Sequence, residues 1–345
     1  MSKTAIGIDF GGTTVKPGVV VGGEIVARLP PIRTHDHAGH DSLLEAIRGA
    51  IEELRKQHPE VAAVGAGLPG MVDSINGRVW QLSNVPGWED VALTALLEEW
   101  TGLPAAIDND ANAMAYAEWL FGAGHEGVNV VCVTLGTGVG GGLILDRKLY
   151  RGSRLGAGEI GQMTIDPNGV PGQYGNYGAL EKYVGHVQIA QRAQTLYRAA
   201  GLTKLLEECS PLALEKSAKA GDTIAHQVWE EVGFNIGITL CDIVWLLNPD
   251  RIVIGGGVGR AGEYVFGPIR RVIEERTMKI FHEGLTIVPA KLGNDAGMIG
   301  SAALALEKSA PRARYGLSSR AGAARRGTSP MQWTFPLSRK RKLQL

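Results

Sequence analysis

The chain is 345 residues long but has few cysteines, no long apolar run and no recognisable leader. Its three cysteines, Cys132, Cys209 and Cys241, lie too far apart for a CxxC site or a disulfide framework, which favours a reducing cytoplasm. No segment has the ~18 uninterrupted apolar residues of a membrane-spanning helix. Asp9 interrupts the N-terminal segment where a secretory signal would be apolar. We therefore expect a cytoplasmic protein with no membrane partner.

The chain also lacks net charge, but its charges are unevenly distributed. Lys and Arg total 35, as do Asp and Glu. Residues 309–345 contain nine basic residues and no acidic one, so residues 1–308 carry 26 basic and 35 acidic residues, a net charge of −9. The tail has no helical or strand period and is expected to be disordered. Its RKRK run is also typical of nucleic-acid or membrane attachment. We favour a solvated extension, because an acidic body argues against duplex DNA as a partner.

The composition is otherwise that of a globular protein, with glycine in excess. Hydrophobic residues make up 44% and charged residues 20% of the chain, which excludes a disordered chain, a collagen and a coiled coil. The 48 glycines are about twice the usual ~7%, which indicates many tight turns and close backbone approaches. The length predicts two domains or one large bilobal domain.

Apolar strand-like segments alternate with helical segments along the chain. The expected strands lie at 4–9, 15–21, 24–29, 61–67, 105–108, 129–135, 141–145, 251–254 and 285–288. The expected helices lie at 42–57, 92–100, 112–120, 180–200, 222–247, 263–275 and 296–307. This alternation predicts an α/β fold with a largely parallel sheet that is covered on both faces.

One segment of the sequence is echoed 125 residues later. Residues 6–20 read IGIDFGGTTVKPGVV and residues 131–145 read VCVTLGTGVGGGLIL, so that Asp9 matches Thr134 and Gly11 matches Gly136. Both are an apolar strand, a turn rich in Gly and Thr, and a second apolar strand. We interpret them as two diverged copies of one hairpin unit, one in each lobe; a chance similarity of two glycine hairpins is the alternative.

Three glycine turns are candidate phosphate cradles, because backbone N–H groups without a nearby Cβ can converge on an anion. They are Gly11-Gly12-Thr13-Thr14, Gly136-Thr137-Gly138-Val139-Gly140 and Gly255-Gly256-Gly257. The pattern of a P-loop is absent, and a dinucleotide fingerprint is incomplete. Asp9 precedes the first turn, where a carboxylate next to a phosphate requires a cation such as Mg²⁺ between them. Plain hairpin turns and a turn-capping Asp9 are the alternatives.

The segment 107–113, IDNDANA, is the strongest catalytic candidate. It places Asp110 at the start of a helix, whose dipole favours an ionised carboxylate that can accept a proton. The alternative is that Asn109 or Asp110 merely caps the helix. Further polar residues could satisfy the hydroxyl groups of a buried polyol, each of which needs a partner. The set is Asn84, Asn109, Asp110, Glu159, Gln162 and Glu181.

The ordered motifs resemble the ROK family of sugar kinases, and most of all its bacterial glucokinases. They read IGIDFGGT, GLPGMVD, SNVPGW, IDNDANA, TLGTGVGGG, GAGEIGQMTIDPNG, GALE, VIGGGVG and NDAGMIGSA, and they cover residues 4–306. The resemblance implies the actin-like ATPase (ribonuclease H-like) fold, with two lobes around a cleft. It implies a small lobe at 1–115 completed by a C-terminal helix at 294–308, a large lobe at 116–293, and a homodimer or homotetramer.

The resemblance also implies Mg-ATP as phosphoryl donor and a hexose as acceptor. Position by position, Asp110 matches the general base of the family, and the sugar-binding positions are Gly70, Asn84, Asn109, Glu159, Gln162 and Glu181. The nucleotide positions are Asp9, Gly11, Gly12, Thr13, Thr14, Lys16, Gly136, Thr137, Gly138, Gly256 and Gly257. No metal is expected on the protein itself; ATP carries the Mg²⁺, with Asp9 as its possible partner.

The chain departs from the family pattern at a structural zinc site. The resemblance places Gln162 where the family has a His, and Gly172, Tyr174 and Ala179 where it has three cysteines. Structural zinc takes four Cys or His ligands, so we expect no structural zinc, and buried cysteines elsewhere. The loop is expected to be stabilised by packing of Tyr174 and Tyr177. Since Gln162 cannot titrate near neutrality as His does, the sugar preference is left open.

The resulting prediction is ATP-dependent phosphorylation of a hexose, glucose to glucose 6-phosphate. Other hexoses (fructose, mannose, allose, N-acetylated amino sugars) and polyphosphate as donor remain alternatives. A sugar-binding regulator without kinase activity is a further alternative. A ROK repressor would carry a helix-turn-helix before the first phosphate strand, which begins here at residue 4, and the presence of Asp110 argues for an active kinase.

Overall fold

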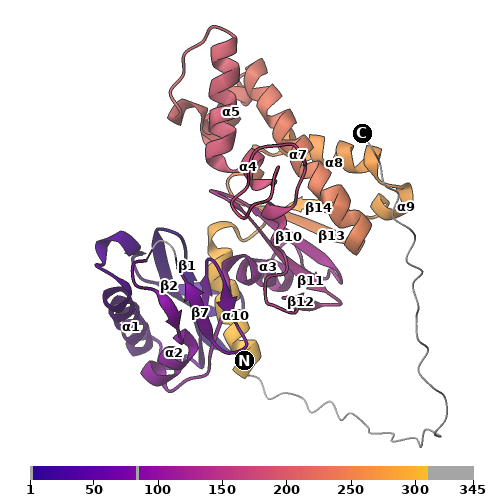
Figure 1. Cartoon of the computed structure of the whole chain (residues 1–345). Helices are drawn as coiled ribbons and strands as arrows, with labels where there is room; N and C mark the ends of the chain where they lie inside the picture. The colour runs from indigo at the N-terminus through magenta and orange to yellow at the C-terminus, as the bar shows by residue number, and fades with distance from the viewer. Residues whose placement is uncertain (1–2, 83–84, 310–345) are drawn as a thin grey trace, which may run out of the picture. The chain divides into compact units, whose positions relative to one another are not determined.

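The computed structural model describes residues 3–82 and 85–309 of the chain, and the predicted basic tail lies outside them apart from Ser309. The first sheet has the strand order β3-β2-β1-β5-β9, with β4 paired to β2 (Figure 1). Strand β1 is antiparallel to β2 and parallel to β5, which is parallel to β9. The strands are β1 (Thr4–Phe10), β2 (Thr14–Val21), β3 (Glu24–Arg28), β4 (Ile32–Arg33), β5 (Ala63–Leu68) and β9 (Ala105–Asn109).

The second sheet repeats this order as β12-β11-β10-β13-β14. Strand β10 is antiparallel to β11 and parallel to β13, as β1 is to β2 and β5. The strands are β10 (Val130–Leu135), β11 (Val139–Leu145), β12 (Lys148–Tyr150), β13 (Arg251–Gly255) and β14 (Thr286–Pro289). The echo in the sequence thus corresponds to two hairpins at the same place in two sheets. Each sheet is mixed rather than largely parallel, because each contains antiparallel hairpin strands beside its parallel ones.

The helices largely follow the predicted pattern. In α1, Leu43, Ile47 and Ile51 recur at helical spacing and are buried in the core of the first sheet. Helices α7 and α8 pack on each other in the core of the second sheet. None of the described helices is long and apolar enough to span a membrane. The helices are α1 (His40–Gln57), α2 (Leu93–Thr101), α3 (Asp110–Phe121), α4 (Glu181–Val184), α5 (His186–Ala199), α6 (Pro211–Lys219), α7 (Thr223–Leu247), α8 (Glu263–Arg276), α9 (Lys279–His282) and α10 (Ala296–Ser309).

One predicted helix is wrong, because the segment 180–200 forms two helices with a break at Gly185. Gly185 has an extended backbone (φ −66°, ψ 153°). The N–H of His186 donates to the carbonyl of Gly136, 3.1 Å away. The chain therefore bends to meet the second glycine turn, and this tertiary contact overrides the helical pattern. A small third sheet was not predicted; its strands β6 (Val72–Asp73), β7 (Arg78–Gln81) and β8 (Glu89–Val91) are too short to show a pattern.

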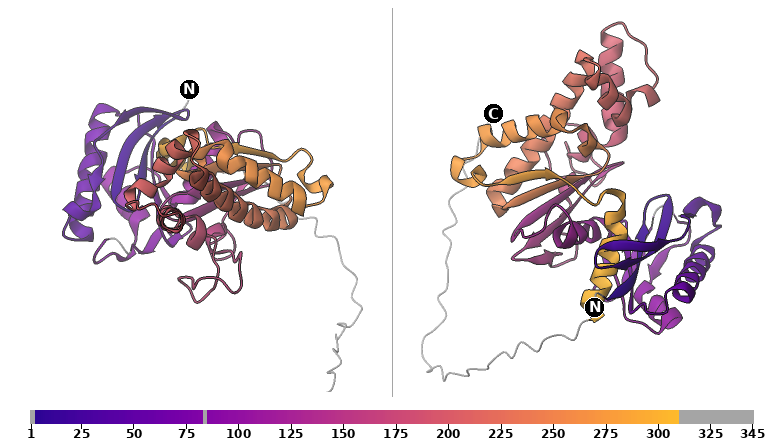
Figure 2. Two further views of the ribbon diagram at one scale, coloured as in Figure 1. Left: turned by 90° about the horizontal axis from the view of Figure 1, so that it is seen from above. Right: turned by 180° about the vertical axis from the view of Figure 1, so that it is seen from behind.

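Several of the excess glycines lie where helices contact strands directly. A Cβ on Gly7 of β1 or Gly65 of β5 would overlap backbone atoms of α10, which packs against both strands (Figure 2). A Cβ on Gly142 of β11 would meet α3 in the same way. Where α3 and α10 pack together, a Cβ on Gly300 would overlap the carbonyl of Ala113. Close helix packing therefore requires glycine at these positions, in addition to the turns.

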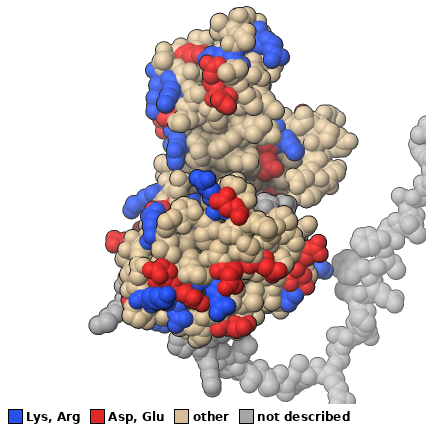
Figure 3. Space-filling view, turned by 90° about the vertical axis from the view of Figure 1, so that its left-hand side faces the viewer, with Lys and Arg blue, Asp and Glu red and all other residues tan. Residues whose placement is uncertain are grey.

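The three cysteines are buried and free, as expected from the sequence. Burial raises the pKa of the Cys241 thiol to about 11 and also raises the pKa of Cys132 and Cys209. On the face drawn in Figure 3, positive and negative side chains are interspersed. Nucleic-acid binding surfaces are typically basic stripes or patches, so this face has no such footprint among its described residues.

Candidate active site

The start of α3 is fixed by Asn109, the last residue of β9. Its side-chain carbonyl accepts hydrogen bonds from the backbone N–H groups of Ala111 (2.9 Å) and Asn112 (3.4 Å). Its amide donates to the carbonyl of Gly70, 3.2 Å away, in the loop after β5. Asn109 thus caps the helix, which was the alternative reading of this residue, and also joins two predicted sugar positions. Asn84, a third such position, lies outside the described residues.

A buried ion pair stabilises the junction between β9 and α3. The Asp108 carboxylate is almost fully buried and contacts the Arg151 guanidinium at 2.6 Å. It also accepts hydrogen bonds from the N–H of Asn109 (2.8 Å) and the side-chain amide of Asn112 (2.9 Å). Arg151 follows β12 of the second sheet, so the pair connects the two sheets. No local signal in the sequence links residues 43 positions apart, so this pair was not predicted.

Asp110 is the first residue of α3 and its carboxyl group is buried. Burial is the largest influence on its pKa, which rises from 3.8 to about 6. The N–H of Ala111, which donates to the carboxylate at 2.9 Å, lowers the pKa, whereas the charges of Asp9 and Glu159 raise it. Burial thus outweighs the helix start in setting the pKa, but a carboxyl group with a pKa of about 6 is still mostly ionised at pH 7, as the sequence predicts. A pKa slightly below neutrality suits a general base, which must be both ionised and basic.

Four predicted acidic residues come together around this point. Asp9 and Glu159 are close enough to Asp110 to raise its pKa, and burial and the nearby Glu181 raise the pKa of Glu159. Lys16 lies 3.0 Å from the Asp9 carboxylate. In the first glycine turn, the N–H of Gly11 donates to the carbonyl of Thr14. The cation next to Asp9 is therefore Lys16, and the acceptors for several hydroxyl groups gather near Asp110.

The second glycine turn is only in part the predicted cradle. The Glu181 carboxylate accepts a hydrogen bond from the N–H of Val139 at 2.9 Å. The N–H of Gly136 donates to the carbonyl of Gly138, also at 2.9 Å. Two of the expected donors are thus used within the protein, and Thr137 and Gly138 supply the remaining N–H groups between the strands. A Cβ on Gly138 would lie 2.4 Å from the Glu181 carboxylate, so the turn passes close to this side chain.

His186 connects the second and third glycine turns and was missed by the sequence analysis. Burial lowers its pKa, against the opposing effect of a hydrogen bond between the ring and the backbone of Leu135. Its Nε2 is buried without a hydrogen-bond partner among the described residues. A Cβ on Gly257 would lie 2.8 Å from that nitrogen. Gly256 has φ +84° and packs on the carbonyl of Leu135, so both turns meet at the end of β10.

The loop after Glu159 is not held as predicted. Tyr174 and Tyr177 are 72% and 54% exposed, so their packing does not stabilise it. Backbone bonds do, including Gly172 N–H to the carbonyl of Asn176 (2.7 Å). The side-chain amide of Asn176 donates to the carbonyl of Gln162, 3.2 Å away. Among the described residues no group of three or more His, Cys, Asp or Glu side chains is placed to hold a metal; the absence of zinc stays a prediction.

The site also fits a nucleotide phosphate chain. The glycines of the second and third turns exclude side chains from the ends of β10 and β13. The orphaned nitrogen of His186 faces the third turn. Lys16 already offsets one of the carboxylates near the first turn. Carboxyl ends of strands are where α/β folds bind ligands.

The sequence matches the model of the ROK family over residues 5–308. A glucokinase of Halalkalibacterium halodurans is 34% identical over 307 residues, which are 86% of this chain and 92% of that protein. A crystal structure of a ROK family glucokinase from Streptomyces griseus with glucose and AMPPNP has a TM-score of 0.72 and 31% identity, over 88% of this chain and 99% of that one. The N-acetylglucosamine repressor of Escherichia coli is 30% identical over 275 residues, which are 79% of this chain and 67% of the repressor. Kinases and repressors thus both resemble this chain.

Proposed function

This chain belongs to the ROK family, and from that premise we propose that it is an ATP-dependent hexose kinase that converts glucose to glucose 6-phosphate. The fold is the two-lobed actin-like ATPase fold of the family, with one lobe built on each sheet. The observation that carries the proposal is the buried carboxyl group of Asp110, which lies at the start of α3 beside further acidic residues.

In the proposed reaction Asp110 is the general base. Its carboxylate takes the proton from the 6-hydroxyl of the hexose, and the hydroxyl oxygen forms the new bond to phosphorus as ADP leaves. Mg-ATP supplies the phosphoryl group when it is bound. The hydrogen bond from Ala111 fixes the orientation of the carboxylate, and the ion pair of Asp108 with Arg151 holds the β9–α3 corner that positions it.

The sugar is held by acceptors on three segments. Asn109 and the Gly70 loop form one side, where one hydrogen bond already joins them. Glu159 and Glu181 offer carboxylate oxygens, and Gln162 follows Glu159 within one short 3₁₀ turn. Each buried hydroxyl needs a partner, so such a set favours a polyol over an apolar acceptor. Glucose is proposed because the similar kinases are described as glucokinases.

The donor is proposed to lie along the carboxyl ends of β1, β10 and β13. The turns at 11–14 and 136–138 and the pair Gly256 and Gly257 would face its phosphates and adenosine. Lys16 and Asp9 would lie next to the metal-bound end, where a Lys can neutralise phosphate charge. His186, which joins the second and third turns, would keep this side of the site in shape.

A sugar-binding regulator is the second candidate, because a repressor matches 79% of this chain. A regulator would need the sugar acceptors but not a proton acceptor tuned near neutrality. The raised pKa of Asp110 therefore favours the kinase.

The test is phosphoryl transfer by the purified full-length protein. Glucose, fructose, mannose, allose and N-acetylglucosamine would each be incubated with Mg-ATP, and with Mg-polyphosphate, and the products followed by ³¹P NMR. We expect glucose 6-phosphate from ATP at the highest kcat/KM. If a folded protein that binds glucose transfers phosphate to none of these sugars, the regulator is correct.

A further inference from the structure

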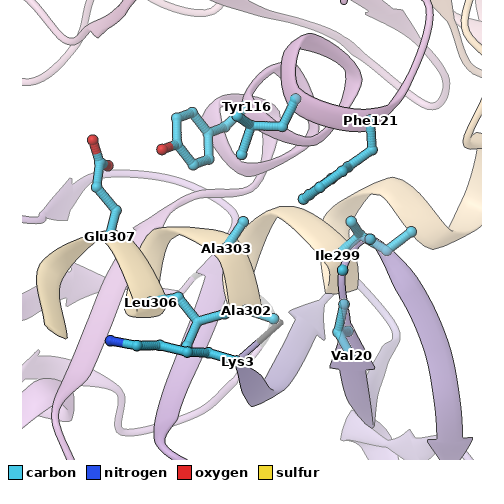
Figure 4. A pocket seen from close by; sticks show the side chains of 12 residues that line it. Lys3, Val20, Tyr116, Phe121, Ile299, Ala302, Ala303, Leu306 and Glu307 are labelled. Atoms are coloured by element: carbon cyan, nitrogen blue, oxygen red, sulfur yellow. The ribbon is translucent and has the colours of Figure 1, made fainter. Parts of the chain in front are cut away.

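A second cavity lies away from the active site, between the ends of α3 and α10 and the β2–β3 turn. Its volume is about 380 Å³, which is at the small end of the range for pockets that bind small molecules. Figure 4 shows side chains of α3, α10 and β2 lining it, together with that of Lys3. The lining comes from Lys3, Val20, Gly22, Gly23, Tyr116, Leu120, Phe121, Ile299, Ala302, Ala303, Leu306 and Glu307.

The cavity is left open by small residues opposite large ones. Ala302 and Ala303 of α10 face the aromatic rings of Tyr116 and Phe121 from α3 (Figure 4). The two helices are held together near their starts by the contact of Gly300 with Ala113, so α10 cannot approach further to fill the gap. On the third side a Cβ on Gly23 would lie 2.6 Å from the Phe121 ring. The packing of α3, α10 and the β2–β3 turn therefore leaves a cavity between them.

The cavity has an apolar end and a polar end. Phe121, Ile299 and Val20 lie at one end, and Glu307, the Tyr116 hydroxyl and the Lys3 ammonium lie towards the other (Figure 4). Burial, the charge of Glu307 and a hydrogen bond between the two side chains raise the pKa of Tyr116, so its hydroxyl stays protonated and donates to the Glu307 carboxylate. Lys3 and Glu307 are both exposed at the mouth of the cavity. One anion, one cation and one hydroxyl are therefore present beside an apolar cavity.

We propose that this cavity binds a small zwitterion with an apolar side chain, the chemistry of an apolar α-amino acid. The side chain would fill the apolar end against Phe121 and Ile299. The ammonium group would be accepted by Glu307 beside the Tyr116 hydroxyl, and the carboxylate would meet Lys3. An amine or a carboxylic acid of the same size would form only one of the two charge-assisted hydrogen bonds.

The cavity is connected to the active site through helix α3. Tyr116 and Phe121 belong to the same short helix that begins at Asp110. Its start and the cavity therefore share one rigid element, and a ligand between α3 and α10 would favour one arrangement of the two helices. A ligand shifts such an equilibrium only by its different affinity for the two arrangements.

The direct test is binding of L-phenylalanine, measured by calorimetry on the full-length protein without sugar or nucleotide. The matched probes are 2-phenylethylamine, which lacks the carboxylate, and 3-phenylpropanoate, which lacks the ammonium group. We expect phenylalanine to bind at least about tenfold more tightly than either probe. Binding of either probe as tightly as phenylalanine would overturn the zwitterion assignment, and no binding of any of the three at millimolar concentration would overturn the site.

Variants test whether phenylalanine binds in this cavity. Glu307→Gln and Lys3→Gln remove one charge each from exposed positions and should each weaken phenylalanine binding about tenfold, whereas Glu274→Gln on α8 makes the same charge change elsewhere and should not. Ala303→Phe should abolish binding by filling the cavity. Unchanged affinity in both charge variants would overturn the proposal even if Ala303→Phe does not fold.

The regulatory part rests on the proposed function and has a separate readout. If the ligand changes the affinity for glucose, glucose must change the affinity for phenylalanine by the same factor. We expect a several-fold shift in the dissociation constant of phenylalanine at saturating glucose. A shift in the wild type that is absent in Ala303→Phe supports coupling, whereas an unchanged constant contradicts it and leaves the binding result standing.

Discussion

The proposed reaction needs an ionised Asp110 carboxylate, but this ionised form lowers the stability of the folded protein. Its pKa is raised from 3.8 to about 6 in the folded protein. The protonated form is therefore favoured by folding, so the stabilisation is complete below pH 3.8 and is lost as the pH rises through 6. Above pH 6 the ionised group costs roughly 3 kcal/mol, since one pKa unit corresponds to about 1.4 kcal/mol.

Asp110→Asn should consequently stabilise the protein. The neutral amide keeps an oxygen that can accept the N–H of Ala111, but it does not carry the buried charge. We expect a free energy of unfolding higher by up to about 3 kcal/mol at pH 8, shrinking towards zero near pH 4. Urea denaturation of both proteins at the two pH values measures this. A variant that is less stable than the wild type at pH 8 would show that the ionised carboxylate does not destabilise the folded protein.

The same pKa predicts the pH dependence of catalysis. A base must be ionised, so kcat/KM for the sugar should fall about tenfold per pH unit below about 6. The measurement is initial rate against pH at low sugar and saturating ATP. A rate that is flat from pH 7 to 5 would exclude Asp110 as the base.

At the scale of elements, close packing of α3 on α10 depends on a glycine. Gly300→Ala places a methyl group on the carbonyl of Ala113 and should destabilise the protein by about 1–3 kcal/mol or more. The matched control is Gly49→Ala in α1, where nothing lies within 4 Å of the added Cβ. That change should stabilise by about 0.5–1 kcal/mol. Thermal or urea unfolding tests the pair, and similar effects at both sites would contradict the packing argument.

The loop at 164–179 is a second element whose support can be tested. Asn176→Ala removes the amide that binds the carbonyl of Gln162, whereas Tyr174→Ala removes an exposed ring. The first should raise the sugar KM more than the ATP KM and speed proteolysis of the loop. The second should change neither. A larger effect of Tyr174→Ala than of Asn176→Ala would contradict this prediction and support stabilisation of the loop by aromatic packing, as the sequence suggested.

At the scale of the whole molecule, the protein is predicted to work without zinc. The resemblance places Gln162, Gly172, Tyr174 and Ala179 where zinc ligands are expected, and hydrogen bonds join this loop. Elemental analysis of the purified protein should find no stoichiometric zinc. A zinc-selective chelator should leave activity intact when Mg²⁺ is in excess. One zinc per chain would contradict the prediction.

Local features of the sequence predicted the longer strands, most of the longer helices and the glycine turns, because these depend on neighbouring residues, whereas the short strands β4, β6, β7, β8 and β12 were not predicted. Contacts between distant segments were not predictable in the same way. Arg151 pairs with Asp108 across 43 residues. Glu118, in the middle of α3, is buried and accepts the N–H of Leu292, 174 residues away. No periodicity marks such partners.

The pKa of Asp110 also depends on distant residues and could not be predicted from the local sequence. The sequence placed Asp110 at a helix start, which favours its ionised form. The opposing effects, burial and the charges of Asp9 and Glu159, come from other segments. The helix break at Gly185 likewise follows from a contact with the second glycine turn, not from the residues around it. The lobe boundaries and the oligomeric state stay predictions.

The central claim is that Asp110 is the base of a glucose kinase, and turnover of Asp110→Asn tests it most directly. Glucose 6-phosphate formation from Mg-ATP would be measured for the wild type and the variant, with glucose binding measured calorimetrically on the same samples. The account predicts that kcat falls by about 10²–10⁴-fold while the variant stays folded and still binds glucose. A folded variant with near-normal kcat would contradict it.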